Sequence, residues 1–191
     1  ASDVYKRQTV GDEGGFAPSL SSNQIAIDLI IESIESSGYK LSEQFFLAID
    51  AAASEMFDDN IKEYELDIER RSLTGEELTD LYGKWIDTYP IISIEDGLAE
   101  DEWEDWQSMT ARLGSRVQLV GDDLLTTNPD RISRAVKERC GNAVLIKPNQ
   151  IGTLSETITA IDMGKSENWG IVVSHRSGET EDTSIADLAL S

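Results

Sequence analysis

The stretch Ala143–Gln150, which reads AVLIKPNQ, contains an apolar run of strand length that ends on Lys147. An apolar run without polar alternation is typical of a strand that is buried on both faces, as in a parallel sheet. A lysine at the end of such a strand is unusual, because a desolvated ammonium group is unfavourable unless an opposite charge pairs with it. The stretch therefore predicts a parallel sheet and makes Lys147 a candidate general base.

Four other apolar runs also end on polar residues. From position 95 to positions 122, 147 and 175 the steps are 27, 25 and 28 residues, which is the length of one strand, one helix and two short loops. The predicted fold is therefore α/β, a (β/α)8 barrel of the TIM type, in which polar residues at the carboxyl ends of strands share one site. The four runs end at Asp50, at Glu95-Asp96, at Asp122-Asp123 and at His175-Arg176-Ser177.

The segments between these runs carry helix signals. Apolar residues at helical spacing in 101–113 predict an amphipathic helix whose core face is rich in tryptophan. At 153–156 the sequence TLSE is a capping box, which predicts that a helix starts there. We expect this second helix to face the core with Leu154, Ile158 and Ile161.

The composition excludes several classes of function. The chain has 191 residues and a formal net charge of −21, and its 37 acidic residues are spread along its length. This charge argues against nucleic acid or an anionic membrane as a partner. Cys140 is the single cysteine, so no internal disulfide can form and a reducing compartment is expected. No apolar stretch approaches the roughly 20 residues of a membrane span.

The first eight residues, ASDVYKRQ, resemble one reading frame of a transposon adapter used in sequencing libraries, and we leave them out of the fold prediction. We expect the natural sequence to begin near Thr9, and residues 9–191 to form part of a barrel domain. A complete barrel usually takes about 250 residues, and we count about six of the eight strands, including a short piece at Val10.

Asp50, Glu95 and Asp122 end three successive strands of the predicted barrel. Carboxylates that point at one another repel unless a cation lies between them. Their oxygen atoms are the ligands that the hard cation Mg²⁺ prefers, so we predict a magnesium site. Each acid taken alone could equally be a helix cap or a solvated charge.

Lys147 follows on the next strand. It can act there as a general base, as a Schiff-base nucleophile, or only as a counter-charge to the acids. Arg176 and Ser177 lie in a loop with a glycine and suit a phosphate or carboxylate group, the alternative being a turn that leads into a helix. His175 is the only histidine, which excludes a histidine-rich zinc site.

Several sequence blocks together resemble the enolase family. The blocks are VGDEGGFAP at 10–18, SIED at 93–96, GDDL at 121–124, Lys147 with NQIG at 149–152, and SHRSGETED at 174–182. Their order and approximate spacing resemble the family from Thr9 to the end of the chain, and the last block is highly specific. Gly97, where many enolases have proline, resembles the bacterial version, whereas Pro148 differs from the commoner apolar residue.

The resemblance implies the enolase-superfamily fold and a lyase reaction of glycolysis, in which 2-phospho-D-glycerate is converted to phosphoenolpyruvate and water. It implies that Lys147 removes the C2 proton and that Glu13 assists loss of the C3 hydroxyl. The implied Mg²⁺ ligands are Asp50, Glu95 and Asp122. The implied substrate-binding residues are Glu13, Glu95, Asp122, Lys147, His175, Arg176 and Ser177.

The resemblance further implies a cytoplasmic homo-oligomer, a dimer or larger, with surface or secreted forms in some members. The family has a smaller N-terminal domain upstream and a further substrate-binding lysine downstream. We therefore expect this chain on its own to be inactive and to have marginal stability.

Three alternatives stay open from the sequence. Another enolase-superfamily enzyme would take a different carboxylate substrate, although the GDEGG and SHRSGETED blocks argue against it. An aldolase-type enzyme would use Lys147 as a Schiff base, although three acids at strand ends argue against it. A non-catalytic adhesion or scaffold role at a cell surface is the third.

Overall fold

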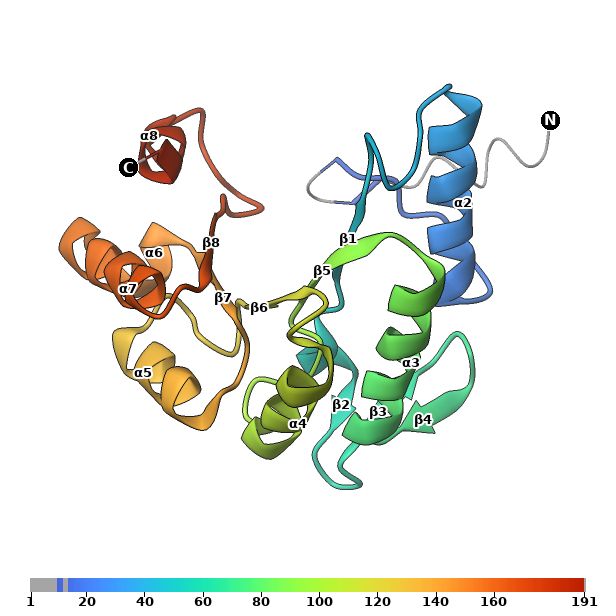
Figure 1. The fold of residues 1–191 in the computed structure, drawn as a ribbon, viewed down its shortest axis with the longest axis horizontal. Helices are drawn as coiled ribbons and strands as arrows, with labels where there is room; N and C mark the ends of the chain where they lie inside the picture. The colour runs from blue at the N-terminus through green and yellow to red at the C-terminus, as the bar shows by residue number, and fades with distance from the viewer. Residues whose placement is uncertain (1–9, 12–13, 191) are drawn as a thin grey trace.

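A computed structural model describes residues 10–11 and 14–190 of the chain (Figure 1). The adapter-like octapeptide 1–8 and Glu13 lie outside the described residues.

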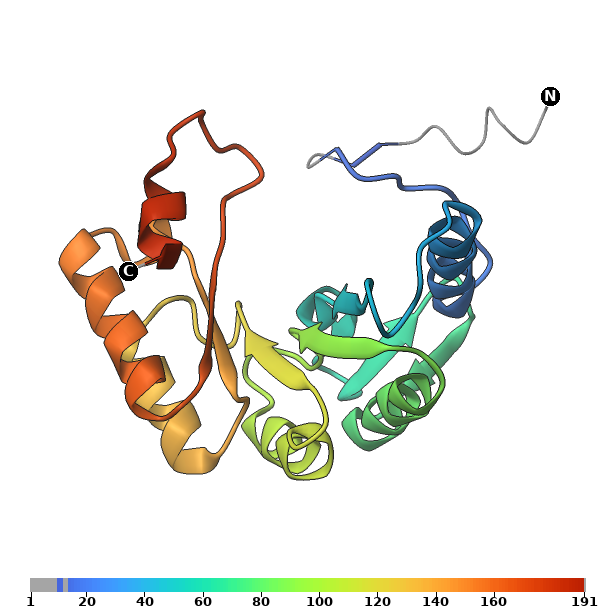
Figure 2. The same ribbon diagram turned by 45° about the horizontal axis from the view of Figure 1, so that its top comes forward.

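The centre of the fold is a five-stranded sheet in which every neighbouring pair of strands is parallel. The order in space is β1-β5-β6-β7-β8, which is also the order in the sequence. The α/β fold predicted from the repeated strand and helix lengths is thereby confirmed. Over the described residues the sheet is open and does not close into a barrel, as Figure 2 shows. The strands are β1 (Leu47–Asp50), β5 (Ile91–Glu95), β6 (Gln118–Gly121), β7 (Ala143–Ile146) and β8 (Gly170–Val173).

Helices follow the strands and cover one side of the sheet. Figure 2 shows the sheet as an open arc with α3, α4, α5 and α7 along its outer side. None of the helices that the structure describes combines the length and the apolar composition needed to cross a membrane. The helices are α2 (Asn23–Ser36), the 3-10 helix η1 (Ala53–Met56), α3 (Gly75–Thr88), α4 (Trp103–Leu113), α5 (Pro129–Glu138), α6 (Pro148–Ile151), α7 (Leu154–Ser166) and α8 (Ser184–Leu190).

A small antiparallel sheet is inserted between β1 and α3 and accounts for the longer step of 45 residues from Asp50 to Glu95. Tyr64 and Leu66 of its middle strand are buried, and the Tyr64 hydroxyl accepts a hydrogen bond from the Ala99 amide at 3.0 Å. This contact attaches the insertion to the loop that follows β5. The strands of the insertion are β2 (Phe57–Asp58), β3 (Glu63–Leu66) and β4 (Arg71–Leu73).

The main core lies between the large sheet and its helices. The predicted face of α4 is buried there, with Trp106 and Met109 fully enclosed. Asn128 caps α5, and Pro129 occupies the first helical position, where its missing N–H is not needed. The burial of α4 thus follows directly from its sequence periodicity.

The structure contradicts two smaller predictions. Leu154 and Ile158 of α7 are 62% and 44% exposed, and only Ile161 of the predicted trio is buried. The buried face of α7 includes Gly164, whose added Cβ would lie only 2.7 Å from Ile171 Cδ1, so at this position the helix lies too close to the sheet for a side chain. Val10 forms an isolated antiparallel bridge with Phe16 and is not a strand of the large sheet.

Candidate active site

Polar residues from four strands meet at the carboxyl edge of the large sheet. Asp50 and Glu95 are paired in register at the ends of β1 and β5. Asp122 directly follows β6, and Lys147 directly follows β7. Because parallel strands end at the same edge, the spacing seen in the sequence becomes a spatial cluster.

Asp96 ties two of the strand-end loops together. Its carboxylate accepts hydrogen bonds from the backbone amides of Asp122 and Asp123, each at 2.9 Å. Its backbone is left-handed, with φ of 42°, and its side chain is buried. Asp96 thus fixes the loop that carries Asp122, a role that the sequence analysis did not assign.

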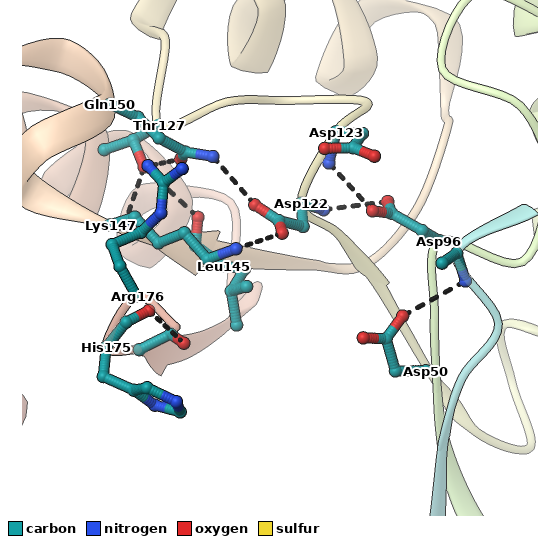
Figure 3. A network of polar contacts seen from close by, with 12 residues as sticks. Asp50, Asp96, Asp122, Asp123, Thr127, Leu145, Lys147, Gln150, His175 and Arg176 are labelled. Atoms are coloured by element: carbon teal, nitrogen blue, oxygen red, sulfur yellow. Dashed lines mark hydrogen bonds and ion pairs between the residues drawn. The ribbon is translucent and has the colours of Figure 1, made fainter. Parts of the chain in front are cut away.

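Both oxygens of the Asp122 carboxylate have partners, as Figure 3 shows. Lys147 Nζ donates to Oδ2 at 2.5 Å, and Gln150 Nε2 donates to Oδ1 at 3.0 Å. The side chains of Lys147 and Asp122 are only 18% and 11% exposed, so solvent screens this ion pair weakly. The predicted candidate base and one predicted metal ligand are therefore in direct contact.

The loop that follows β6 is held in an unusual conformation. Thr126 and Thr127 both have left-handed backbones, with φ of 48° and 54°, which for β-branched residues costs about 1–3 kcal/mol each. Arg131 braces this loop, because its Nε donates to the Leu124 carbonyl at 2.5 Å and its guanidinium also donates to the Glu100 carbonyl at 2.7 Å. The brace joins the loop after β6 to the loop after β5.

The electrostatics of the edge reflect crowded negative charge. Burial, with further repulsion from Asp50, Asp122 and Asp96, raises the pKa of Glu95 to about 7. Burial also raises the pKa of Asp96 to about 7, although two backbone hydrogen bonds oppose the rise. The pKa of Asp50 is raised chiefly by burial, and the positive charge of Lys147 lowers the pKa of both Asp50 and Glu95.

This acidic cluster could hold a metal ion. One carboxylate oxygen from each of Asp96, Asp122 and Asp123 lies within 4.8 Å of the other two. Asp50 and Glu95 are not in this tight group, but their charges repel that of Asp122. An all-oxygen donor set with excess negative charge suits a hard divalent cation, so the residues present fit such an ion.

The loop after β8 differs from the others, because His175, Arg176 and Ser177 are all exposed. Arg176 Nη1 donates to Asn149 Oδ1 at 3.3 Å, which brings it to the segment that follows Lys147. Its positive charge lowers the pKa of Asp123, which is otherwise raised mainly by burial. This loop therefore borders the acidic cluster without being fixed to it as firmly as Lys147 is.

A separate cavity of about 330 Å³ lies between α2 and α3 beside β1. Its lining is mostly apolar, including Ile27, Leu78 and Trp85, and it does not contain Lys147 or Asp122. Of the edge residues, Asp50 borders this cavity, whereas Glu95, Asp122 and Lys147 lie outside it.

Comparison with known protein families shows to which family the chain belongs. Residues 2–191 match the family model described as "Enolase, C-terminal TIM barrel domain". The chain belongs to the enolase family. It is 55% identical over 182 residues to the protein named "Enolase" from Natranaerobius thermophilus, which covers 95% of this chain and 42% of that protein. It is 54% identical over 188 residues to "Enolase 2" of Pseudomonas syringae pv. syringae, covering 98% and 44%.

This enolase-family chain therefore spans less than half the length of the curated relatives it matches. Within it, the arrangement at the carboxyl edge combines a lysine with a cluster of carboxylates. Such a site can bind a divalent cation and can move a proton to or from a bound carboxylate substrate.

The site also contains residues to which the sequence assigned no individual role. Asp96 follows a predicted ligand directly, and the paired acids Glu95-Asp96 were a usable signal for it. Thr127 carries no comparable signal, because its contact with Gln150 depends on the left-handed turn at 126–127.

Proposed function

We propose that residues 9–191 of this enolase-family chain carry the base and the metal-binding carboxylates for converting 2-phospho-D-glycerate to phosphoenolpyruvate and water. The observation that carries the proposal is the contact between Lys147 Nζ and Asp122 Oδ2 at 2.5 Å within an acidic cluster at the carboxyl edge of the sheet. Such a pair sets a potential base beside a potential metal ligand, which is the arrangement that this reaction needs.

The chemistry explains why both parts are required. A C–H bond next to a carboxylate is very weakly acidic, and its removal places further negative charge on the substrate. Mg²⁺, when bound by Asp50, Glu95 and Asp122, would stabilise that charge. Lys147 would accept the C2 proton as a neutral amine, for which its ammonium group must first release a proton and so give up the ion pair with Asp122.

The remaining roles are those that the resemblance to the enolase family implies. Glu13, which lies outside the described residues, would give a proton to the departing C3 hydroxyl. His175, Arg176 and Ser177 would bind the phosphate or carboxylate group, with Arg176 as the charged donor. The proposal includes a glycolytic role in the cytoplasm and a homo-oligomeric assembly of the whole protein.

The test is a chimaera in which this chain replaces the matching 182-residue segment of the Natranaerobius thermophilus enolase, to which it is 55% identical. With Mg²⁺ present, phosphoenolpyruvate should form from 2-phospho-D-glycerate, as followed by ultraviolet absorbance. Removal of Mg²⁺ by a chelator should stop the reaction, and readdition should restore it.

Asp122→Asn in the chimaera should weaken Mg²⁺ binding and turnover together, by about 100-fold or more, because a ligand charge is lost. Asp130→Asn, at an exposed position in the first turn of α5, is the matched control and should leave both unchanged. A folded chimaera that turns over without a metal, or that keeps full activity with Asp122→Asn, would overturn the proposal. Borohydride trapping of substrate on Lys147 would instead support the aldolase-type alternative.

A further inference from the structure

The Thr127 hydroxyl is a buried junction between two strand-end loops. Its side chain is fully enclosed, and its Oγ1 accepts a hydrogen bond from the Lys147 amide at 2.8 Å. The same oxygen donates to Gln150 Oε1 at 2.8 Å and lies 3.5 Å from the Leu145 carbonyl. Since a hydroxyl has one proton to donate, the shorter contact with Gln150 takes it.

The Gln150 amide bridges the Thr127 hydroxyl and the Asp122 carboxylate. With Oε1 bonded to Thr127, the Nε2 group points at Asp122 and donates to Oδ1 at 3.0 Å (Figure 3). An amide turned the other way would present its oxygen to a carboxylate oxygen, which is repulsive. The acceptor-only carboxylate of Asp122 therefore selects this orientation, and the Thr127 hydroxyl holds the amide in it by donating to Oε1.

The second donor on Asp122 is anchored at the same point. Lys147 Nζ bonds Oδ2, while the backbone amide of Lys147 bonds Thr127 Oγ1. Lys147 and Gln150 lie at the start and within the single turn of α6, whose first residue, Pro148, has no amide to contribute. One hydroxyl thus fixes the position of segment 147–150 relative to the loop that carries Asp122.

We propose that Thr127 is a positioning residue that holds Lys147 and Gln150 on the Asp122 carboxylate, and so presents that carboxylate in one orientation to a divalent cation. The inference rests on the proposed function for its cation, but its hydrogen-bond geometry is testable without metal. The left-handed backbone at Thr127 is consistent with this role, since only the surrounding contacts keep a β-branched residue there.

The experiment titrates the 191-residue chain with Mn²⁺ and measures free metal by electron paramagnetic resonance, with Mg²⁺ as competitor. Thr127→Val keeps the shape of the side chain but removes the hydroxyl, and it should weaken Mn²⁺ binding by about 10- to 100-fold. Thr127→Ser restores the hydroxyl and should recover most of the affinity. Thr157→Val removes another fully buried threonine hydroxyl, in α7, and should leave metal affinity unchanged.

Gln150→Leu provides a second route that leaves the strained turn untouched. It should also weaken Mn²⁺ binding. The double variant with Thr127→Val should lose less affinity than the product of the two single losses, because both substitutions act on Asp122. If Thr127→Val does not fold, unchanged affinity in Gln150→Leu overturns the proposal. Wild-type affinity in folded Thr127→Val, no rescue by serine, or an equal loss with Thr157→Val would also overturn it.

A metal-free measurement separates this inference from the proposed function. In nitrogen-15 nuclear magnetic resonance spectra of the metal-free chain, Thr127→Val should shift the resonances of the Gln150 side-chain amide. It should also speed hydrogen exchange at the Lys147 backbone amide, whereas Thr157→Val should do neither. If the wild-type chain binds no metal but these changes occur, the proposed function fails and the positioning role holds. If neither signal changes, the positioning role fails regardless of metal binding.

Discussion

The loops after β6 and β7 differ sharply from the loop after β8, although all three leave the same edge of one sheet. The first two carry Asp122 and Lys147, whose side chains are nearly buried and bonded to each other. The third carries His175, Arg176 and Ser177, all of which are exposed. One part of the candidate site is therefore held by packing and hydrogen bonds, and the other lies on the surface.

The difference indicates how the proposed work is divided. Groups that hold a cation or take a proton must sit in a fixed geometry, since small displacements reduce rates strongly. Groups that bind a substrate anion can lie on a surface loop and close on the ligand. Substitutions in the two parts should therefore have different kinetic signatures.

The largest expected effect is in the buried part. Lys147→Ala in the chimaera should lower the exchange of the C2 proton of 2-phospho-D-glycerate with solvent by about 10²- to 10⁴-fold. Proton nuclear magnetic resonance in deuterated water measures this exchange. Lys84→Ala, on the exposed face of α3, is the control. Retained exchange in a folded, metal-binding Lys147→Ala protein would remove the lysine from its role.

In the exposed part, Arg176→Ala should raise KM by about 10- to 100-fold through the loss of a charge-assisted hydrogen bond. It should leave the melting temperature unchanged, because Arg176 is an exposed loop residue. Steady-state kinetics and thermal unfolding of the same samples provide both readouts. A fall in kcat with KM unchanged would mean that the loop acts in chemistry rather than in binding.

Asp96→Asn should lower the free energy of unfolding by about 1–3 kcal/mol, because one of two buried amide donors would then face an NH₂ group. Asp182→Asn is the matched change near the exposed loop, where Asp182 accepts from the Ser184 amide at 2.8 Å. It should have a smaller effect. Denaturant unfolding compares the two, and equal losses would show that the buried loops are no more firmly held than the exposed one.

The smallest effect concerns Cys140, which precedes β7 and is fully buried in the main core. Burial raises its pKa from the ordinary 9.0 to about 11. The thiolate therefore forms more readily in the unfolded chain, so this contribution to stability is complete below pH 9 and is lost as the pH rises towards 11. Between about pH 8 and 10 the free energy of unfolding should fall by about 1 kcal/mol more than in Cys140→Ala. Identical pH profiles would contradict the burial effect.

The sequence predicted the features that depend on local pattern. Apolar runs that end on polar residues located the strands, and the helical spacing in 101–113 identified the buried face with Trp106 and Met109. Both succeed because the burial of an apolar face follows the period of the element that carries it. The positions of Lys147 and Asp122 at one edge followed from the same rule.

Close packing and backbone strain could not be predicted in this way. The buried face of α7 is lined by Thr157, Ala160, Ile161 and Gly164, and at Gly164 the helix approaches the sheet too closely for a side chain. That distance is set by tertiary packing, which overrides the apolar pattern of Leu154 and Ile158. Likewise, nothing local marks Thr126 and Thr127 as left-handed, so the junction with Gln150 emerges only in three dimensions.

The two left-handed threonines should have different evolutionary fates. Asparagine is one base change away from some threonine codons and tolerates this backbone region better than a β-branched residue does. At position 126 the change keeps the bond that the main-chain amide donates to the Asp122 carbonyl at 2.6 Å, and it relieves strain. At position 127 it would force a larger amide into a fully enclosed space. Asparagine should therefore be tolerated at position 126 and removed by selection at position 127.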